Sequence, residues 1–251
     1  MSQPQHPRDT YLTIFGRKPV LEALDDPDLT FGPLRIDQRA KGDLIQQIIK
    51  MARKRGIKVT RASSREVNRI SRNAKQDQGC VLDVVAPQMM ALDAWLETRT
   101  QTAQLLLLDG VTTPSNVGMI IRAATAAGLG GIIVPRRGCP AVGPLVIKAS
   151  AGTAFKAPLL RAERAVDAVL ALKNAGFATH GLMGDADQVL YECHAPDDCV
   201  WILGNETNGI SDAVASHLDR RITIPMAGGV ESLNVATAGA IVAFELARRQ
   251  R

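Results

Sequence analysis

Three loops of the chain combine polar side chains with glycine, and each of them follows a short apolar run. Leu108 is followed by DGVTTPSNVGMIIRAA, Leu203 by GNETNGIS, and Ile224 by PMAGGVESLNVATAGA. Ligands of open α/β sheets collect at the carboxyl ends of the strands. If the apolar runs are strands of one sheet, these three loops are the first candidates for a reaction centre.

The first loop carries an asparagine and an arginine. Asn116 stands just before an apolar helix, and Arg122 lies six residues later, nearly two turns along that helix. An arginine near the end of a sheet can clamp a phosphate and polarise a nearby hydroxyl, which a reaction on ribose requires. In the alternative interpretation Asn116 or Ser115 is only the helix N-cap, and Arg122 is a surface arginine.

The second and third loops carry a carboxylate and further polar groups. In GNETNG a tight turn accounts for the glycines and asparagines, but it accounts less readily for Glu206 at the apex. In the third loop Gly228 and Gly229 precede Ser232 and Asn234, which open the last helix. Capping of that helix is the alternative to a functional role for Ser232 and Asn234.

Two common nucleotide sites and a metal centre are not predicted. Residues 109–116, after the first apolar run, contain a single glycine and form no GxGxxG loop, and GxxxxGK[ST] occurs nowhere in the chain. The four cysteines form no paired CxxC clusters, and the group Cys193, His194 and Cys199 has no second pair at ligand spacing. We therefore expect no metal, ordinary buried thiols and a reducing, cytoplasmic environment.

Residues 104–251 show the alternation of strands and helices that is typical of an α/β domain with a parallel sheet. The continuous apolar run 105–108 favours a strand that is covered on both faces. Strands are predicted at residues 105–108, 132–134, 177–182, 200–203 and 222–224, and helices at residues 117–127, 142–150, 163–174 and 233–249. The three polar loops would then lie at one edge of the sheet.

Residues 1–87 indicate a smaller α/β domain. Strands are predicted at residues 34–37, 57–60 and 80–85, and helices at residues 16–24, 43–53 and around 67–70, the last of them capped by Ser63 or Ser64. Residues 88–103 are predicted to be a linker with a short helix around residues 92–96. Its polar end, TRTQT, is the expected hinge.

Positive charge is concentrated in the first domain. Residues 35–75 hold 13 Lys or Arg and 3 Asp or Glu, whereas residues 101–251 hold 13 of each kind. This asymmetry favours a basic domain that binds a polyanion beside a separate domain that carries the reaction. In the alternative interpretation the charges only form the solvated surface of the helices. The longest apolar stretch, residues 235–244, is about half of a membrane span, and residues 1–10 lack the apolar core of a secretory signal, so a soluble protein is expected.

In their order and spacing the three loops resemble the signature motifs of the TrmH branch of the SPOUT methyltransferases. The first motif corresponds to Asn116 with Arg122, the second to LGNETNGIS at residues 203–211, and the third to IPMAGGVESLNVA at residues 224–236. The resemblance runs from about residue 105 to the C-terminus. The basic segment before it is similar, much more weakly, to the ribosomal-protein-like RNA-binding domain of many members, which often have a histidine where this chain has Asp77.

The resemblance implies a fold, a cofactor and a set of site residues. The fold would be a trefoil-knotted parallel sheet in a homodimer packed around the knot. The cofactor would be S-adenosylmethionine, with contacts from Leu203, Gly204, Ile224, Met226, Ser232 and Leu233. The characteristic polar positions around the reacting ribose would be Asn116, Arg122, Glu206, Ser232 and Asn234.

The implied reaction is methylation of a ribose 2'-hydroxyl in RNA, in which the hydroxyl attacks the sulfonium methyl. Arg122 is expected to help remove the hydroxyl proton, either directly or through a neighbouring phosphate. Ribosomal RNA is expected rather than transfer RNA, by analogy with members that carry a basic first domain, and guanosine is one candidate target. The alternatives are an inactive dimeric RNA-binding scaffold and a SPOUT base methyltransferase.

RNA contacts are expected in the most basic part of the first domain. The residues concerned are Arg53, Lys54, Arg55 and Lys58. Reversing their charges is expected to weaken RNA binding and to flatten its salt dependence while cofactor binding persists.

Overall fold

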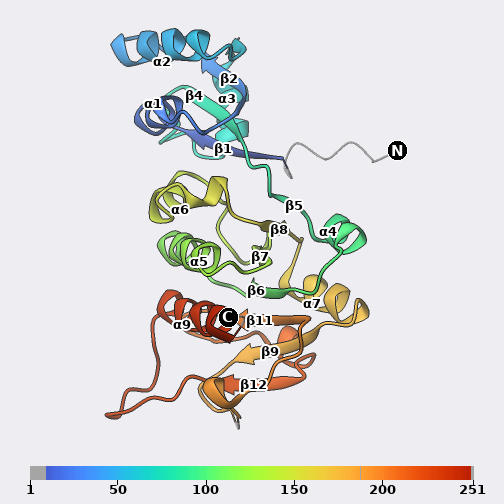
Figure 1. Cartoon of the computed structure of the whole chain (residues 1–251). Coiled ribbons are helices and arrows are strands. Elements are labelled where there is room, and N and C mark those ends of the chain that lie inside the picture. Colours follow the sequence, from blue (N-terminus) through green and yellow to red (C-terminus); the bar gives the residue numbers. More distant parts are fainter. Residues whose placement is uncertain (1–9, 187, 250–251) are drawn as a thin grey trace. The chain divides into compact units, whose positions relative to one another are not determined.

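The computed structural model describes residues 10–186 and 188–249, which form two compact units that divide after Pro87 (Figure 1). Residues 1–9 of the first predicted domain and residues 250–251 of the second lie outside the described residues. Both units are α/β structures, each with its own sheet.

The first unit is built on a four-stranded sheet in the order β1-β4-β2-β3. Its elements are β1 (Tyr11–Phe15), α1 (Arg17–Asp25), β2 (Phe31–Asp37), α2 (Asp43–Lys54), β3 (Val59–Ala62), α3 (Ser64–Ser71) and β4 (Cys80–Val85). The predicted helices are present, and Ser63 caps α3 by accepting a hydrogen bond from the Glu66 N–H. The sequence analysis missed β1, although its residues alternate between buried and half-buried. Strand β3 begins two residues later than predicted, because the Ile57 N–H closes the end of α2 by bonding to the Ala52 carbonyl.

The second unit is built on an eight-stranded sheet in the order β10-β12-β9-β11-β6-β7-β8-β5. Its strands are β5 (Met90–Ala91), β6 (Gln104–Leu108), β7 (Gly131–Ile133), β8 (Leu159–Arg161), β9 (Ala178–Leu182), β10 (Gln188–Val189), β11 (Cys199–Leu203) and β12 (Arg220–Thr223). Its α-helices are α4 (Leu92–Thr98), α5 (Pro114–Ala126), α6 (Pro144–Ala149), α7 (Ala165–Asn174), α8 (Asp212–Ala215) and α9 (Val235–Arg249). All neighbouring strands in this sheet pair in parallel, which confirms the predicted fold class. The trefoil knot stays a prediction.

Helices cover both faces of this parallel sheet. Leu105 and Leu107 of β6 pack with α7 and α4 on one face. The alternate residues Leu106 and Leu108, also fully buried, point to the other face, where α5, α6 and α9 lie (Figure 1). Gly239 lets α9 approach closely, because a Cβ there would lie 2.8 Å from the Leu203 side chain. The continuous apolar runs of the central strands follow from this double cover.

Residues 88–103 differ from the linker that we predicted. Strand β5 joins the sheet beside β8, and Trp95 of α4 packs against the core of the second unit. The expected hinge is held as well, because Arg99 forms an ion pair with Asp198 at 2.6 Å and its guanidinium lies 4.5 Å from the centre of the Phe177 ring. These contacts make the segment part of the second unit. Sequence patterns missed them because both partners of Arg99 lie far along the chain.

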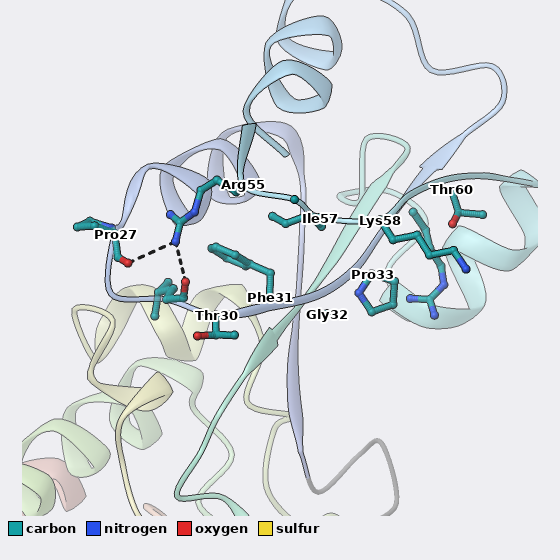
Figure 2. Close-up of a pocket in the computed structure, with 12 residues that line it drawn as sticks. Pro27, Thr30, Phe31, Gly32, Pro33, Arg55, Ile57, Lys58 and Thr60 are labelled. Atoms are coloured by element: carbon teal, nitrogen blue, oxygen red, sulfur yellow. Dashed lines mark hydrogen bonds between the residues drawn. The ribbon is translucent and has the colours of Figure 1, made fainter. Parts of the chain in front are cut away.

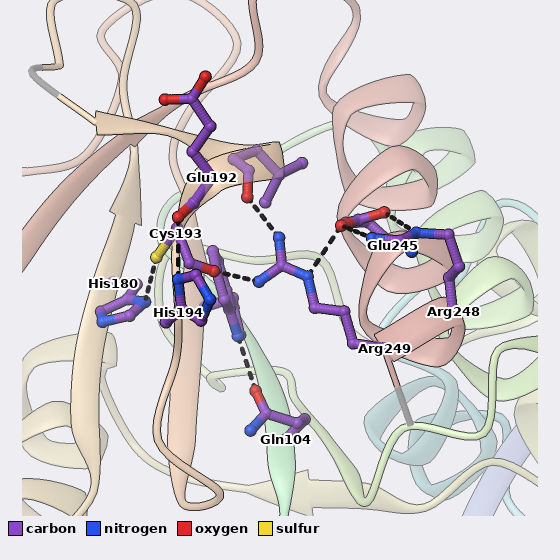
Figure 3. Close-up of polar contacts among 10 residues, drawn as sticks. Gln104, His180, Glu192, Cys193, His194, Glu245, Arg248 and Arg249 are labelled. Atoms are coloured by element: carbon purple, nitrogen blue, oxygen red, sulfur yellow. Dashed lines mark hydrogen bonds and ion pairs between the residues drawn. The ribbon is translucent and has the colours of Figure 1, made fainter. Parts of the chain in front are cut away.

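The C-terminal end of α9 is anchored by a cluster of charges (Figure 3). Glu245 accepts hydrogen bonds from Arg248 at 2.8 and 2.9 Å and from Arg249 at 2.8 Å. Arg249 also donates to the carbonyl oxygens of Leu190 and Cys193. The cluster therefore ties α9 to the segment that follows β10, and β10 in turn pairs with β12.

We expect acid to destabilise the second unit in two pH windows. Burial lowers the pKa of His180 to about 4. The neutral ring therefore makes its full contribution to the free energy of unfolding above the ordinary histidine pKa of 6.5, and this contribution is lost as the pH falls through about 4. Hydrogen bonds from Arg248 and Arg249 lower the pKa of Glu245 to about 2 against the opposing effect of burial. The contribution of Glu245 is therefore present above pH 4.5 and is lost as the pH falls towards 2.

Urea unfolding of the full chain at a series of pH values tests this expectation. Glu245→Gln is expected to reduce the loss of stability in the lower window and to leave the upper one unchanged. Glu163→Gln is the matched control, because Glu163 pairs with Arg137 on the surface with 49% of its side chain exposed. The same pH dependence for both variants would contradict the assignment to Glu245.

Candidate active site

The three polar loops lie at one edge of the parallel sheet. They follow β6, β11 and β12, and all three strands run in the same direction. The carboxyl ends of parallel strands meet at the same edge, where ligands bind in open α/β sheets. The predicted loops are therefore close enough to form one site.

Several hydrogen bonds join the first loop to the second. The Asp109 carboxylate accepts from the Ser211 N–H at 2.7 Å, and the Asn205 side chain donates to the Gly110 carbonyl at 2.7 Å. Their strands, β6 and β11, are neighbours in the sheet. Asp109 and Asn205 therefore hold the two loops together, a role that their sequence positions did not indicate.

The second loop is a tight turn that is closed by its own backbone. Asn205 and Gly209 exchange backbone hydrogen bonds at 2.8 and 3.0 Å, and Gly209 has a left-handed φ of 67°. The Asn205 side chain accepts from the N–H groups of Thr207 and Asn208. Gly204 is needed because a Cβ there would lie 2.2 Å from the backbone carbon of Gly209. The turn therefore fixes the position of Glu206.

A chain of hydrogen bonds links one residue from each loop. Asn116 donates to the Glu206 carboxylate at 2.9 Å, and Asn234 donates to the side-chain oxygen of Asn116 at 3.2 Å. The side-chain oxygen of Asn234 accepts from the Ala236 N–H at 2.8 Å, so Asn234 also caps α9. Asn116 is buried, and its amide is held at both ends. The structure thus brings together three of the five predicted polar residues.

Glu206 enters this chain as a carboxylate. Partial burial raises the pKa of its carboxyl group, but hydrogen bonds from the Asn116 side chain and from the Thr112 N–H outweigh burial and lower the pKa below its ordinary value. Glu206 accepts at neutral pH, which fixes Asn116 as its donor. The carboxylate therefore sets the direction of the whole chain of hydrogen bonds.

Arg122 and Ser232 are not part of this chain of hydrogen bonds. Arg122 is exposed on α5 and forms no hydrogen bond or ion pair with the residues that the structure describes. Six helical residues correspond to a rotation that leaves Arg122 about 120° around the helix from Asn116. Arg122 therefore points away from Asn116 within one chain, and its place beside the reacting ribose stays a prediction. Ser232 is exposed and lines the pocket described next.

A pocket of about 390 Å³ lies at the carboxyl ends of β9 and β12, which is within the range of small-molecule sites. It is lined by Leu182, Met183, Gly184, Ile222, Thr223, Ile224, Pro225, Met226, Val230, Glu231, Ser232, Leu233 and Ala238. Four of the six predicted cofactor residues are thus brought together. The other two, Leu203 and Gly204, do not line this pocket, because Leu203 is buried against Gly239 and Gly204 packs on its own turn.

The residues that follow β9 form a wall of the pocket that was not predicted from the sequence. Leu182, Met183 and Gly184 line the pocket, and β9 lies between β11 and β12 in the sheet. A strand ending at Leu182 was predicted, and this loop follows its carboxyl end in the same way as the three polar loops follow theirs. The three residues were overlooked because they carry no polar side chain.

The lining chemistry fits a cofactor that has an apolar ring and a positive centre. Ile222, Ile224 and Leu233 supply apolar walls. Glu231 is the only charged side chain among the described residues that line the pocket. A flat base and a sulfonium cation, as in S-adenosylmethionine, match an apolar pocket with one carboxylate.

The four residues predicted to contact RNA fall into two groups. Arg53, Lys54 and Lys58 are exposed at the end of α2 and in the loop that follows it. Arg55 instead donates hydrogen bonds to the carbonyl oxygens of Leu24 at 3.0 Å and Leu29 at 2.8 Å. Arg55 thus closes the loop between α1 and β2, and its charge reversal would disturb the fold as well as any RNA contact.

The buried thiols are arranged differently from a metal site. Cys193 lies with its sulfur 3.8 Å from the Nδ1 atom of His180, and His194 turns back to the Glu192 carbonyl instead. Within residues 10–186 and 188–249 no group of three or more His, Cys, Asp or Glu side chains could hold a metal ion. In the same ranges no helix combines the length and the apolar character that crossing a membrane requires.

The chain matches two family models that together span both units. Residues 103–244 match the SpoU rRNA Methylase family, and residues 13–90 match a family described as RNA 2'-O ribose methyltransferase substrate binding. The first match covers the three loops and the pocket.

Curated proteins and solved structures agree with these models. The chain is 32% identical to the 23S rRNA (guanosine-2'-O-)-methyltransferase RlmB of Neisseria meningitidis serogroup B, over 85% of this chain and 86% of the relative. It resembles a protein from Porphyromonas gingivalis described as an RNA methyltransferase of the TrmH family (TM-score 0.64, 27% identity, 96% of this chain and 91% of that one). It also resembles an AdoMet-bound rRNA methyltransferase from Sinorhizobium meliloti (TM-score 0.65, 25% identity, 96% and 87%). With its loops, pocket and parallel sheet matched in this way, the chain belongs to the SpoU rRNA methylase family.

Proposed function

We propose that this chain is an enzyme that methylates a ribose 2'-hydroxyl in RNA, and that its substrate is ribosomal RNA rather than transfer RNA. The observation that carries the proposal is the hydrogen-bonded chain of Glu206, Asn116 and Asn234, which the backbone connects directly to a cofactor-sized pocket. Leu233, which lines the pocket, directly precedes Asn234. The Neisseria relative is described as acting on a guanosine of 23S rRNA, which favours guanosine as the target here.

The pocket is the site that we propose for S-adenosylmethionine. Ile224, Met226, Ser232 and Leu233 would hold it, with Leu182 to Gly184 as the opposite wall. When bound, the cofactor supplies a methyl group on a sulfonium sulfur. The Sinorhizobium structure, described as AdoMet-bound, supports this choice of cofactor.

The side chains around the pocket would orient the ribose and assist loss of its proton. Asn116 and Asn234 have fixed amides, so they can hold a sugar hydroxyl without reorganising. An arginine side chain is a permanent cation in proteins, and so we propose that Arg122 holds a neighbouring phosphate and stabilises the developing charge on the 2'-oxygen. Positioning of this kind can supply about 7 to 11 kcal/mol in the best cases.

We propose that the active form is a homodimer. Met119 on α5 and Phe244 on α9 are 43% and 53% exposed, and the two helices pack beside each other. Met119 and Arg122 lie three residues apart, on the same face of α5. A second copy of the chain covering this face would bury the apolar side chains and bring Arg122 into the interface, where it would gain the partners that it lacks among the described residues of its own chain.

The double variant Met119→Glu and Phe244→Glu tests the dimer. We expect sedimentation to give the mass of one chain instead of two, because two carboxylates would be buried unpaired in the interface. The rate of methyl transfer should fall with it, since Arg122 acts at that interface. Leu170→Glu is the control, because Leu170 is 41% exposed on α7, across the sheet, and should change neither. A monomeric wild type would refute the proposal.

We propose that the first unit binds the RNA. The match of residues 13–90 to a substrate-binding family supports this, as do the exposed cations Arg53, Lys54 and Lys58. We further propose that the protein acts in the cytoplasm, where its four cysteines, all free, would stay reduced.

A tritium-transfer assay tests the proposed function. The methyl donor is labelled S-adenosylmethionine, and the acceptor is ribosomal RNA from cells that lack the protein. Nuclease digestion should release 2'-O-methylguanosine. A methylated base would instead indicate a base methyltransferase. Incorporation no higher than with Arg122→Ala would indicate an inactive RNA-binding scaffold. Transfer RNA from the same cells is the comparison that decides between the two substrate classes.

A further inference from the structure

The first unit contains a groove that the active site does not use. Its volume is about 830 Å³, and twelve residues line it (Figure 2). The cations Arg35, Arg55 and Lys58 are among them, and the described lining residues include no carboxylate. The aromatic ring of Phe31 also lines it. A groove with this composition suits a ligand that combines negative charge with a flat ring.

The groove exists because β2 and β3 separate at one end. Their pairing begins at Leu34 and Val59, and the Leu34 N–H bonds to the Lys58 carbonyl at 3.0 Å. Pro33, the residue before Leu34, has no N–H to donate to a neighbouring strand. The register between β2 and β4 also shifts between Phe31 and Leu34. The first residues of β2 therefore diverge from the loop after α2 and leave an open space.

One wall of the groove is fixed by Arg55. Its guanidinium donates to backbone carbonyls in the last turn of α1 and in the loop before β2, and it lies 4.8 Å from the centre of the Phe31 ring. Figure 2 shows Phe31 against Arg55 at one end of the groove and Lys58 with Thr60 at the other. The ring is therefore held in place before any ligand arrives, which lowers the entropy cost of binding to it.

The other two cations remain able to bind an anion. Arg35 pairs with Asp83 at 2.9 Å and keeps 26% of its side chain exposed. Lys58 is exposed, and its side chain forms no hydrogen bond or ion pair with the part of the chain that the structure describes. An ammonium group and a partly neutralised guanidinium that line the same groove are suited to one phosphate.

We propose that this groove binds one nucleotide of the RNA substrate, with its phosphate on Lys58 and Arg35 and its base against Phe31. The inference rests on the proposed function, because it takes RNA as the polyanion. It adds a specific contact that lies outside the methyl-transfer site. The threonine hydroxyls of Thr30 and Thr60 are available to the sugar or base edge.

An equilibrium binding experiment tests whether RNA occupies the groove. It measures the affinity of the full chain for a fluorescent single-stranded RNA of roughly 12 nucleotides. Lys58→Glu is compared with Lys50→Glu, which makes the same charge change at an exposed position of α2 outside the groove. We expect Lys58→Glu to weaken binding about tenfold more than Lys50→Glu, and to lower the salt slope by about 0.7 more, the value for one phosphate contact. Phe31→Leu, which keeps an apolar side chain, should weaken binding without changing the salt slope.

Photocrosslinking of 4-thiouridine RNA to the wild type gives an independent readout. Crosslinks on the peptides that contain Phe31 and Lys58 would support the proposal. Equal effects of Lys58→Glu and Lys50→Glu, or crosslinks elsewhere only, would overturn it. Displacement of the RNA by guanosine monophosphate at equal concentration would show a free-nucleotide site and would also overturn it.

Methyl transfer by the wild type is measured in parallel with these binding experiments. RNA methylation without groove crosslinks refutes the inference alone. Groove crosslinks without methylation of any RNA refute the proposed enzyme function alone.

Discussion

Replacing Arg122 with alanine is expected to lower the single-turnover rate of methyl transfer by about 10² to 10⁴-fold, the usual range for a group that assists proton transfer. The side chain is exposed and has no partner among the described residues, so its removal costs the fold little. The loss should therefore appear in the chemical step. Rapid-quench measurement with saturating RNA and cofactor isolates that step.

The controls separate chemistry from binding. Affinity for S-adenosylmethionine, measured by calorimetry, should be unchanged, because the pocket does not include Arg122. Arg122→Lys should recover only part of the rate, since an ammonium keeps the charge but loses the planar pair of donors. A rate for Arg122→Ala within threefold of the wild type would remove Arg122 from the reaction.

The meeting of Asn116, Glu206 and Asn234 followed from the sequence for a physical reason. Each residue stands in a loop after an apolar run, and parallel strands place such loops at one edge. Continuous apolar runs indicate parallel strands because both faces are buried. Neither step needs the order of the strands, and both are visible in local sequence.

The remaining features of the site depend on strand order and on contacts between distant residues. Because β9 inserts between β11 and β12, residues 182–184 became a wall of the pocket and Leu203 did not. The two-residue strands β5 and β10 are too short to show any period. Arg55 and Arg99 both resemble surface cations in sequence, and only the tertiary fold shows that each closes a loop.

Gly204→Ala is expected to destabilise the second unit by about 3 kcal/mol and to abolish most of the methyl-transfer activity. A Cβ at this position would lie 2.2 Å from the carbon and 2.6 Å from the oxygen of Gly209 and 2.3 Å from the nitrogen of Ile210. These are backbone atoms, so no rotamer change can relieve the overlap, and such overpacking costs about 1 to 3 kcal/mol or more. Urea unfolding measures the first effect, and tritium transfer measures the second.

The loss of activity should exceed what the loss of stability explains, because the displaced turn carries Glu206. Two glycines provide the controls. A Cβ at Gly184 would have no atom within 4 Å, so Gly184→Ala should leave stability within about 0.5 kcal/mol of the wild type. The three atoms nearest to a Cβ at Gly131 would belong to the side chains of Leu160 and Leu105 and not to the backbone, so Gly131→Ala should destabilise the fold less than Gly204→Ala and spare the activity of the folded fraction. If Gly204→Ala kept full activity per folded molecule, the position of Glu206 would not depend on the turn, and the carboxylate could not be what holds Asn116 and Asn234 in line.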